Sequence, residues 1–337
     1  MAVLPPNCAQ AQHNDLNSHR ESVPGRTSRD KELKHIYDKL TPNTKPLKTA
    51  VIHPTDENSL RGAFEAAAAK LMTPILVGPE DKIRKAAKDA NIDISAFEIV
   101  HTEHSHAAAE MGVELVRTGK AEALMKGKID TPEFLSPIVA KEGQLRTDKR
   151  MSHVFIMEDP GYHKPLYITD AAVNEAPDLM MKRDIIQNAV DLFWKIEGCE
   201  PKVAILAASE KVEPRQQATL DAAALTVMAL RGQITGAKVE GPFGMDNAIS
   251  KKSANLKGIF SDVAGDPDIL VFPDLESGNI YFKSRVLMSQ APLGGVVVGA
   301  KVPIILNSRS AEAEERKASA AIALVASRSQ TRAPKKP

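Results

Sequence analysis

The strongest chemical signal in the sequence is a serine, an arginine and two glutamates beside the start of a helical stretch. Ser308 and Arg309 follow the apolar run 304–306, and Glu314 and Glu315 lie in the Ala-rich stretch behind them. In open α/β sheets, ligands bind at the carboxyl ends of strands, where helix N-termini offer free N–H groups. A hydroxyl, a guanidinium and a carboxylate placed there can stabilise an oxyanion, hold a phosphate and accept a proton. Ser308 and Glu315 are seven positions apart, about two helical turns, so a continuous helix would stack them on one face.

Helix capping explains the same residues almost as well. Serine is a preferred N-cap residue, and acidic residues in a first turn offset the helix dipole. Ser308, Glu314 and Glu315, taken one by one, fit a cap as readily as a catalytic group. The sequence leaves both interpretations open.

Two lysines follow a second predicted strand, 123–125. Lys126 and Lys128 flank Gly127, which allows close approach of the backbone, so both ammonium groups could meet phosphates. The pattern is weak when it stands alone.

Four further polar residues are candidate substrate ligands. Asn279 and Lys283 are four positions apart in a stretch that runs into a helix, so they share one helical face and suit an anionic substrate. Asp170 ends the predicted strand 166–169, and Asp246 follows Gly241-Pro242 in a loop that enters a helix. The alternatives are a solvated face for the first pair, a turn residue for Asp170 and an N-cap for Asp246.

The elements that must position these residues alternate along the chain. From Thr49 onward short β-rich runs alternate with helical stretches, which predicts an α/β fold with a largely parallel sheet and helices on both faces. The runs 154–157 and 166–169, joined by Glu158-Asp159-Pro160-Gly161, predict an antiparallel hairpin. We place a domain boundary before this hairpin. The predicted organisation is a mobile N-terminal extension (1–44), a first α/β domain (45–150 plus 291–330) and a second (151–290).

The composition narrows the class of protein. The formal net charge of +1 provides no field for a polyanion, so no nucleic-acid partner is expected. No apolar run approaches the length of a membrane span, and residues 1–44 contain no apolar signal core. The cysteines, Cys8 and Cys199, have no CxxC partner, and the histidines are scattered without metal-ligand spacing. We therefore predict a cytoplasmic protein with no membrane partner and no protein-built metal site.

Together and in this order, the motifs resemble the phosphate acetyltransferase and phosphate butyryltransferase family. The resemblance covers about residues 49–327 and is closest to the butyryl-type branch and to the transferase part of fused enoyl-CoA hydratase/phosphate acetyltransferase proteins. The segments that carry it are Ala123–Lys128, Leu166–Asp170, Gly241-Pro242 with Asp246, Pro273-Asp274 with Gly278, Asn279 and Lys283, and Ser308-Arg309. The fold that the resemblance implies is that of the isocitrate and isopropylmalate dehydrogenases, two three-layer α/β/α domains flanking a cleft, usually as a homodimer.

The resemblance also implies a reaction, in which an acyl phosphate and CoA give an acyl-CoA and phosphate. Ser308 would then stabilise the oxyanion, Arg309 would bind the phosphoryl group, and an acid in the following helix would take the thiol proton. CoA is a substrate here, and no cofactor is expected. Acetyl enzymes carry Asp at the base position, where Glu314 and Glu315 both occur here, and an arginine near the CoA phosphate is replaced around residues 135–137. Both departures favour a range of short acyl groups, from acetyl to propionyl or butyryl.

The alternative function is a metal- and NAD(P)-dependent dehydrogenase of the same fold, because fold alone does not decide function. No cluster of acids is spaced to hold Mg²⁺ beside a hydroxy-acid site. A third hypothesis is a noncatalytic protein that kept the fold, which would bind CoA without turnover or not at all.

Overall fold

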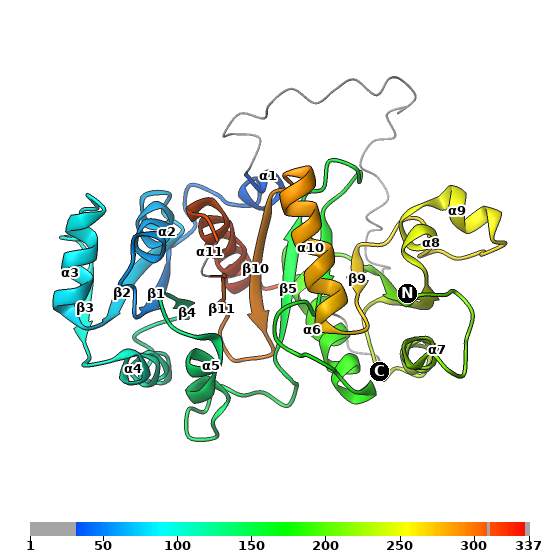
Figure 1. The fold of residues 1–337 in the computed structure, drawn as a ribbon, viewed down its shortest axis with the longest axis horizontal. Helices are drawn as coiled ribbons and strands as arrows, with labels where there is room; N and C mark the ends of the chain where they lie inside the picture. The colour runs from blue at the N-terminus through cyan, green and yellow to red at the C-terminus, as the bar shows by residue number, and fades with distance from the viewer. Residues whose placement is uncertain (1–31, 309–310, 334–337) are drawn as a thin grey trace, which may run out of the picture.

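Within the described residues, a single mixed sheet of eleven strands runs through the molecule (Figure 1). The computed structural model describes residues 32–308 and 311–333. The strands are β1 (Leu47–Ile52), β2 (Met72–Gly78), β3 (Glu98–His101), β4 (Ala123–Lys126), β5 (Ser152–Met157), β6 (Leu166–Thr169), β7 (Lys202–Leu206), β8 (Lys238–Phe243), β9 (Ile269–Val271), β10 (Leu293–Val298) and β11 (Ile304–Ile305). Their order across the sheet is β3-β2-β1-β4-β11-β10-β5-β6-β9-β7-β8.

Helices cover both faces of this sheet, as the alternating sequence pattern predicts. One face packs against α1 (Lys34–Tyr37), α2 (Glu57–Ala68), α3 (Glu80–Asp89), α6 (Leu179–Glu197), α7 (Gln217–Leu230) and α11 (Ala313–Arg328). The other face carries α4 (Ser105–Arg117) and α5 (Thr131–Val139) on the first half, and α8 (Met245–Ile249), α9 (Lys251–Leu256) and α10 (Leu275–Ser289) on the second. Among the described residues, no helix combines the length and the apolar character that a membrane crossing requires.

Most strand pairs are parallel, and the antiparallel pairs lie together in the middle of the sheet. The predicted hairpin is confirmed, because β5 pairs with β6 in antiparallel register. The chain returns to its first half at the end, where β11 pairs with β4 and α11 packs on α2. The antiparallel pair β5–β10 joins this half to the second, so the sheet is continuous across the predicted domain boundary.

The packed part of the chain begins earlier than the sequence suggests. Leu33 and Ile36 are fully buried in the core on the α11 face. His35 and Lys39 each bond a carboxylate oxygen of Glu197 on α6 at 2.8 Å. The prediction of a mobile extension up to residue 44 is therefore wrong for residues 33–40. Residues 1–31, which include Cys8, lie outside the described residues.

The segment around Gly241-Pro242 is a strand and not the predicted loop. Both residues belong to β8, which is an edge strand paired only with β7 in the described sheet. An edge position tolerates a proline because the missing N–H has no ladder partner to lose.

Candidate active site

Three neighbouring parallel strands bring the predicted motifs to one edge of the sheet. β4 lies between β1 and β11 and runs parallel to both. Their carboxyl ends therefore meet, and the residues that follow them are His53 after β1, Lys126-Gly127-Lys128 at β4, and Asn307-Ser308 after β11. Lys126 is buried, whereas Lys128 is exposed. The sequence prediction that the lysine motif and the serine motif belong to one site is consistent with this arrangement.

Glu315 faces this strand end, and Glu314 does not. The side-chain amide of Asn307 donates to Glu315 Oε1 at 3.1 Å, and burial raises the pKa of the Glu315 carboxyl. The Glu314 side chain is 42% exposed and pairs with Lys317 at 2.8 Å. The sequence left open which glutamate points inward, and the contacts favour Glu315.

Ser308 lies in the loop before α11 rather than in the helix. The helix begins at Ala313, and its N-cap position is Glu312, whose side chain forms no cap hydrogen bond. The predicted stacking of Ser308 and Glu315 along two helical turns is therefore wrong. The capping explanation for Ser308 is wrong as well, since this exposed serine precedes the cap by four positions. Arg309 lies outside the described residues.

Arg316 ties the two strand ends together, and the sequence analysis missed it. Its Nη1 donates to the carbonyl oxygen of Lys126 at 3.2 Å, and its Nη2 donates to that of Ser308 at 3.0 Å. The side chain is 2% exposed and runs against Gly62 of α2, where an added Cβ would lie 2.6 Å from Arg316 Cδ. From the sequence, an arginine in an Ala-rich, charged stretch cannot be told from an arginine that faces solvent. The only signal for a buried position was the adjacent candidate base, Glu315.

Several buried polar atoms near this strand end lack hydrogen-bond partners among the described residues. They include Asn307 Oδ1 and Arg316 Nε. Burial lowers the pKa of His153 to about 4, so the ring is neutral near neutral pH. An unpaired buried polar atom costs about 1–3 kcal/mol. Asn307 and Arg316 flank the predicted catalytic loop, which suits a site that meets a polar ligand.

Asp170 and Asn279 form a second group, at the end of β6 and the second turn of α10. The Asp170 carboxylate accepts hydrogen bonds from the N–H groups of residues 172–174 and from Asn174 Nδ2. Asn279 Nδ2 donates to the carbonyl oxygen of Ala171 at 3.1 Å. These contacts hold the loop at residues 170–174, which favours the turn role that the sequence left open for Asp170.

Asp246 and Lys283 lie at the surface. Asp246 is not the predicted N-cap, since Gly244 takes that position of α8. The carboxylate of Asp246 instead pairs with Lys257 at 3.0 Å. This ion pair lowers the pKa of Asp246. Lys283 is exposed on α10, one turn after Asn279 as predicted. The described contacts give neither residue a link to Glu315, and their substrate-binding role stays a prediction.

A family model decides the class of protein. The model described as "Phosphate acetyl/butaryl transferase" matches residues 102–324, a range that contains every site residue predicted from the sequence. The chain belongs to this family. The family predicted from the ordered motifs is confirmed, and so is the prediction that the protein is a phosphate acyltransferase.

Individual relatives agree with this assignment. The acyltransferase is 50% identical over 290 residues to a phosphate acetyltransferase of Rhizobium meliloti, covering 85% of this chain and 92% of the relative. It is 40% identical over 276 residues to a phosphate butyryltransferase of Clostridium acetobutylicum, covering 82% and 92%. A solved branched-chain phosphotransacylase from Enterococcus faecalis V583 superposes with a TM-score of 0.74 at 29% identity, covering 84% of this chain and all of that one. The dehydrogenase alternative is set aside by this membership.

Proposed function

We propose that the acyltransferase moves a short acyl group reversibly between the sulfur of CoA and inorganic phosphate. The observation that carries this proposal is the Glu315 carboxyl, which is partly buried, has a raised pKa and lies beside Asn307 at the end of β11. A carboxylate in this position suits proton transfer to and from a substrate. The acyl groups that we propose are acetyl, propionyl and butyryl.

In the proposed reaction, Glu315 accepts the proton of the CoA thiol. A free thiol has a pKa of ~8.5, so most of it is protonated near neutral pH and the nucleophilic thiolate requires a base. A base works best when its pKa approaches the operating pH, and burial moves the pKa of Glu315 in that direction. The thiolate sulfur then bonds to the carbonyl carbon of the acyl phosphate, and phosphate leaves with the electron pair of the broken C–O bond.

Ser308 and Arg309 take the charges that develop in this step. We assign the Ser308 hydroxyl to the carbonyl oxygen, which becomes an oxyanion, and the Arg309 guanidinium to the phosphoryl group in a bidentate pair. Arg316 supports this role as a positioning residue, because its hydrogen bond to the Ser308 carbonyl oxygen holds the loop that carries the serine. No cofactor takes part in the proposed reaction.

We further propose that the protein works in the cytoplasm as a homodimer, with two α/β domains (45–150 plus 291–330, and 151–290) flanking the cleft. The support for the dimer is α10, in which only Gly278 is buried while Ile280, Leu287 and Met288 are 69%, 79% and 83% exposed. A second copy packed on this helix would remove those apolar side chains from water. Size-exclusion chromatography with light scattering tests this, and Leu287→Lys/Met288→Lys should shift a dimer to monomers.

The experiment that tests the function is thioester formation from CoA with acetyl, propionyl or butyryl phosphate, followed by absorbance with purified protein in the presence of a chelator. We expect turnover with all three donors. Activity that disappears in chelator and returns with Mg²⁺ would contradict the metal-free mechanism. A thermal shift with NAD(P)⁺ and Mg²⁺ but none with CoA would revive the dehydrogenase alternative.

A further inference from the structure

One buried hydroxyl, that of Ser319 on α11, connects three parts of the candidate active site. Ser319 is 0% exposed. Its hydroxyl donates a hydrogen bond to the Glu315 carbonyl oxygen at 2.8 Å. It accepts from the backbone N–H of Gly295 on β10 at 2.9 Å and from the side-chain amide of Asn307 at 3.0 Å. A strand, the loop that carries Ser308 and the helix that carries the candidate base therefore meet at one oxygen atom.

All the hydrogen-bonding capacity of this hydroxyl is in use. A serine hydroxyl has one hydrogen to donate and two lone pairs that accept. The hydrogen goes to Glu315, and the lone pairs are taken by Gly295 and Asn307, so the hydroxyl cannot also donate to Asn307. The atom that Asn307 turns toward Ser319 must therefore be a donor, which assigns its Nδ2 to this side.

The same amide group reaches the candidate base. Asn307 Nδ2 carries two hydrogens, and it also donates to Glu315 Oε1 at 3.1 Å. If the amide were rotated by half a turn, its oxygen would face the carboxylate, and two acceptors would oppose each other. Ser319 disfavours this orientation, because the rotated amide would also lose its hydrogen bond to the hydroxyl.

The sheet leaves room for these contacts where β11 departs from β10. The two strands pair only at Val297 and Ile304, and beyond this pair the N–H of Gly295 has the Ser319 hydroxyl as its partner. An added Cβ at Gly294 would lie 3.0 Å from a backbone carbon of α11, so glycine lets the helix lie this close to the strand. The Ser319 hydroxyl thus replaces a strand partner at the start of the predicted catalytic loop.

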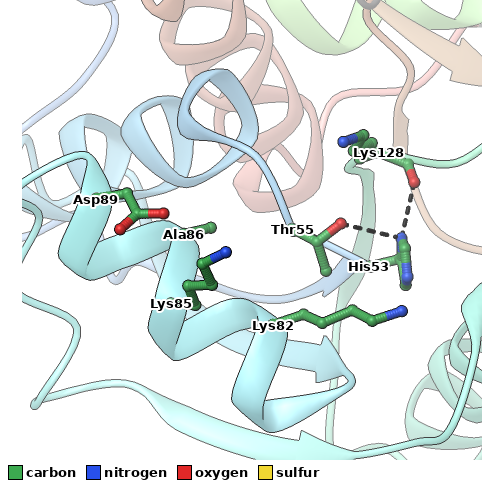
Figure 2. Close-up of a pocket in the computed structure, with 7 residues that line it drawn as sticks. All are labelled: His53, Thr55, Lys82, Lys85, Ala86, Asp89 and Lys128. Atoms are coloured by element: carbon green, nitrogen blue, oxygen red, sulfur yellow. Dashed lines mark hydrogen bonds between the residues drawn. The ribbon is translucent and has the colours of Figure 1, made fainter.

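The Ser319 contacts are separate from the cavity at the neighbouring strand ends. That cavity has a volume of about 400 Å³ and is lined by the residues labelled in Figure 2, among them His53 and Lys128. His53 follows β1 and Lys128 follows β4, whereas Ser319 reaches β10 and the end of β11. Ser319, Asn307 and Glu315 are not among the lining residues. A substitution at Ser319 is therefore expected to act on the base and to leave this cavity as it is.

We propose that Ser319 is a positioning residue of the reaction, which orients the Asn307 amide toward the Glu315 carboxyl and links the loop of Ser308 to β10 and α11. This inference rests on the proposed function, which makes Glu315 the base. Ser319 touches no substrate itself, because its side chain is fully buried. It acts through Asn307, whose hydrogen bond favours the ionised form of the Glu315 carboxyl.

The charged groups around the base stay the same in the test. Burial raises the pKa of Glu315, Asn307 and Arg316 lower it, and the Glu312 carboxylate raises it. Asp56, at the start of the packed helix α2, acts on Arg316. A substitution at Ser319 removes none of these charges, so a change in the pKa of Glu315 reports the Asn307 amide.

The test is the pH profile of kcat/KM for Ser319→Ala in the full chain. Its acidic limb is the pH range in which activity falls because Glu315 takes up a proton. The variant frees the Asn307 amide, so the pKa of Glu315 should rise and the limb should move to higher pH by about 0.5 unit. The plateau kcat should fall by about 3–10-fold, the equivalent of one ordinary hydrogen bond. KM for CoA and for the acyl phosphate should stay near the wild-type values.

A double-mutant cycle with Asn307→Leu separates orientation from packing. If Ser319 acts through Asn307, adding Ser319→Ala to Asn307→Leu should move the limb no further. If Ser319 only fills space, the limb of Ser319→Ala stays at the wild-type pH, and this result overturns the proposal. Two shifts that add in the double variant overturn it as well.

The matched control is Thr226→Val on α7. Its hydroxyl also donates to the carbonyl oxygen four residues earlier, that of Ala222, and it contacts the carbonyl oxygen of Gly241 on β8. This variant should melt at a lower temperature and keep the acidic limb in place. Ser319→Cys keeps the side-chain shape with a weaker acceptor and serves if the alanine variant does not fold. Its limb should move in the same direction by a smaller amount, and a limb that does not move overturns the proposal.

Failure of the proposed function looks different, because the wild type itself would then form no thioester. In that case an NMR titration of protein labelled with ¹³C at the glutamate carboxyls still tests the contacts, and Glu315→Gln assigns the resonance. An equal pKa of Glu315 in the wild type and in Ser319→Ala refutes the positioning role.

Discussion

Two carboxyls, the partly buried Glu315 and the buried Asp170, have pKa values shifted in the same direction but differ in their surroundings. Burial raises the pKa of both. Asp170 is 2% exposed, and three backbone N–H groups and one side-chain amide donate to its oxygens. Glu315 is only partly buried, and Asn307 is its single described hydrogen-bond donor. A raised pKa therefore does not identify a catalytic group by itself, and the number of donors already bound to the carboxylate separates the two.

The comparison assigns each carboxyl a function. In the proposed reaction a general base must reach the CoA thiol and take its proton, and we propose Glu315 for this role because it lies beside Asn307 at the loop of Ser308. Asp170 uses its oxygens to fix the loop 170–174, and a proton there would weaken the hydrogen bonds that hold the loop. We expect substitutions at Glu315 to affect turnover and substitutions at Asp170 to affect stability.

The largest expected effect is the loss of turnover in Glu315→Gln. The amide preserves the shape of the side chain but cannot accept the thiol proton, so kcat should fall by about 10²–10⁴. CoA affinity and the melting temperature should stay near the wild-type values. Thioester formation followed by absorbance gives kcat, isothermal titration gives the CoA affinity, and scanning calorimetry gives the melting temperature.

The matched control for this variant is Glu314→Gln on the adjacent position of α11. It breaks only the surface pair with Lys317, which is worth less than about 1 kcal/mol. A larger loss of turnover in Glu314→Gln than in Glu315→Gln would reverse the assignment of the base.

Ser308→Ala should lower kcat by about 10²–10³, because it removes one donor to the developing oxyanion. Its melting temperature should change little, since Ser308 is an exposed residue that does not cap α11. If Ser308→Ala melts at a lower temperature and keeps its turnover, Ser308 has a structural role and not a catalytic one. Arg316→Lys tests the position of the loop separately. Loss of the hydrogen bond to the Ser308 carbonyl oxygen should displace Ser308 and lower kcat, while KM for CoA stays unchanged.

The strand and helix alternation predicted most of the fold because each element carries its own local signal. The runs 154–157 and 166–169 are apolar and flank Asp159-Pro160-Gly161, so the hairpin needed no distant information. The strand containing Gly241-Pro242 was missed because both residues disfavour strands, and only its edge position in the sheet accommodates them. Leu33 and Ile36 were missed although Leu33, Ile36, Tyr37 and Leu40 have the spacing of one apolar helix face, because this face is short and lies in an otherwise polar segment.

The candidate site was predicted in its residue types but not in its geometry. Position after a strand marked Ser308 and Lys128, because the end of a strand can be recognised from sequence. The start of α11 at Ala313 could not be fixed, since Ser308 and Ser310 are preferred cap residues by type whereas Glu312, which takes the N-cap position, is not.

A smaller effect is expected at the second carboxyl. Asp170→Ala should reduce the free energy of unfolding by about 3 kcal/mol, because the N–H groups of residues 172–174 lose a buried acceptor. Turnover per folded molecule should fall much less than in Glu315→Gln. Urea unfolding gives the stability, and activity normalised to the folded fraction gives the turnover. Full stability with lost activity would instead support the substrate-binding role predicted from the sequence.

The smallest expected effect concerns the pH dependence of turnover and the hydrogen bond between Asn307 and Glu315. The base must be ionised, so kcat/KM falls as the pH drops through the pKa of Glu315, which lies above the ordinary value of 4.5. The Asn307 amide stabilises the ionised form and opposes that rise. Asn307→Leu removes this donor at similar volume, so the pKa of Glu315 should rise further. The acidic limb should then move to higher pH by about 0.5–1 unit, the equivalent of about 1 kcal/mol.

Two further variants serve as controls for this shift. Glu315→Gln should abolish the limb, whereas Asn174→Leu, which removes the corresponding amide from Asp170, should leave it in place. An acidic limb that shifts in Asn174→Leu but not in Asn307→Leu would contradict this assignment. It would show that the ionisation of Asp170, and not of Glu315, controls turnover.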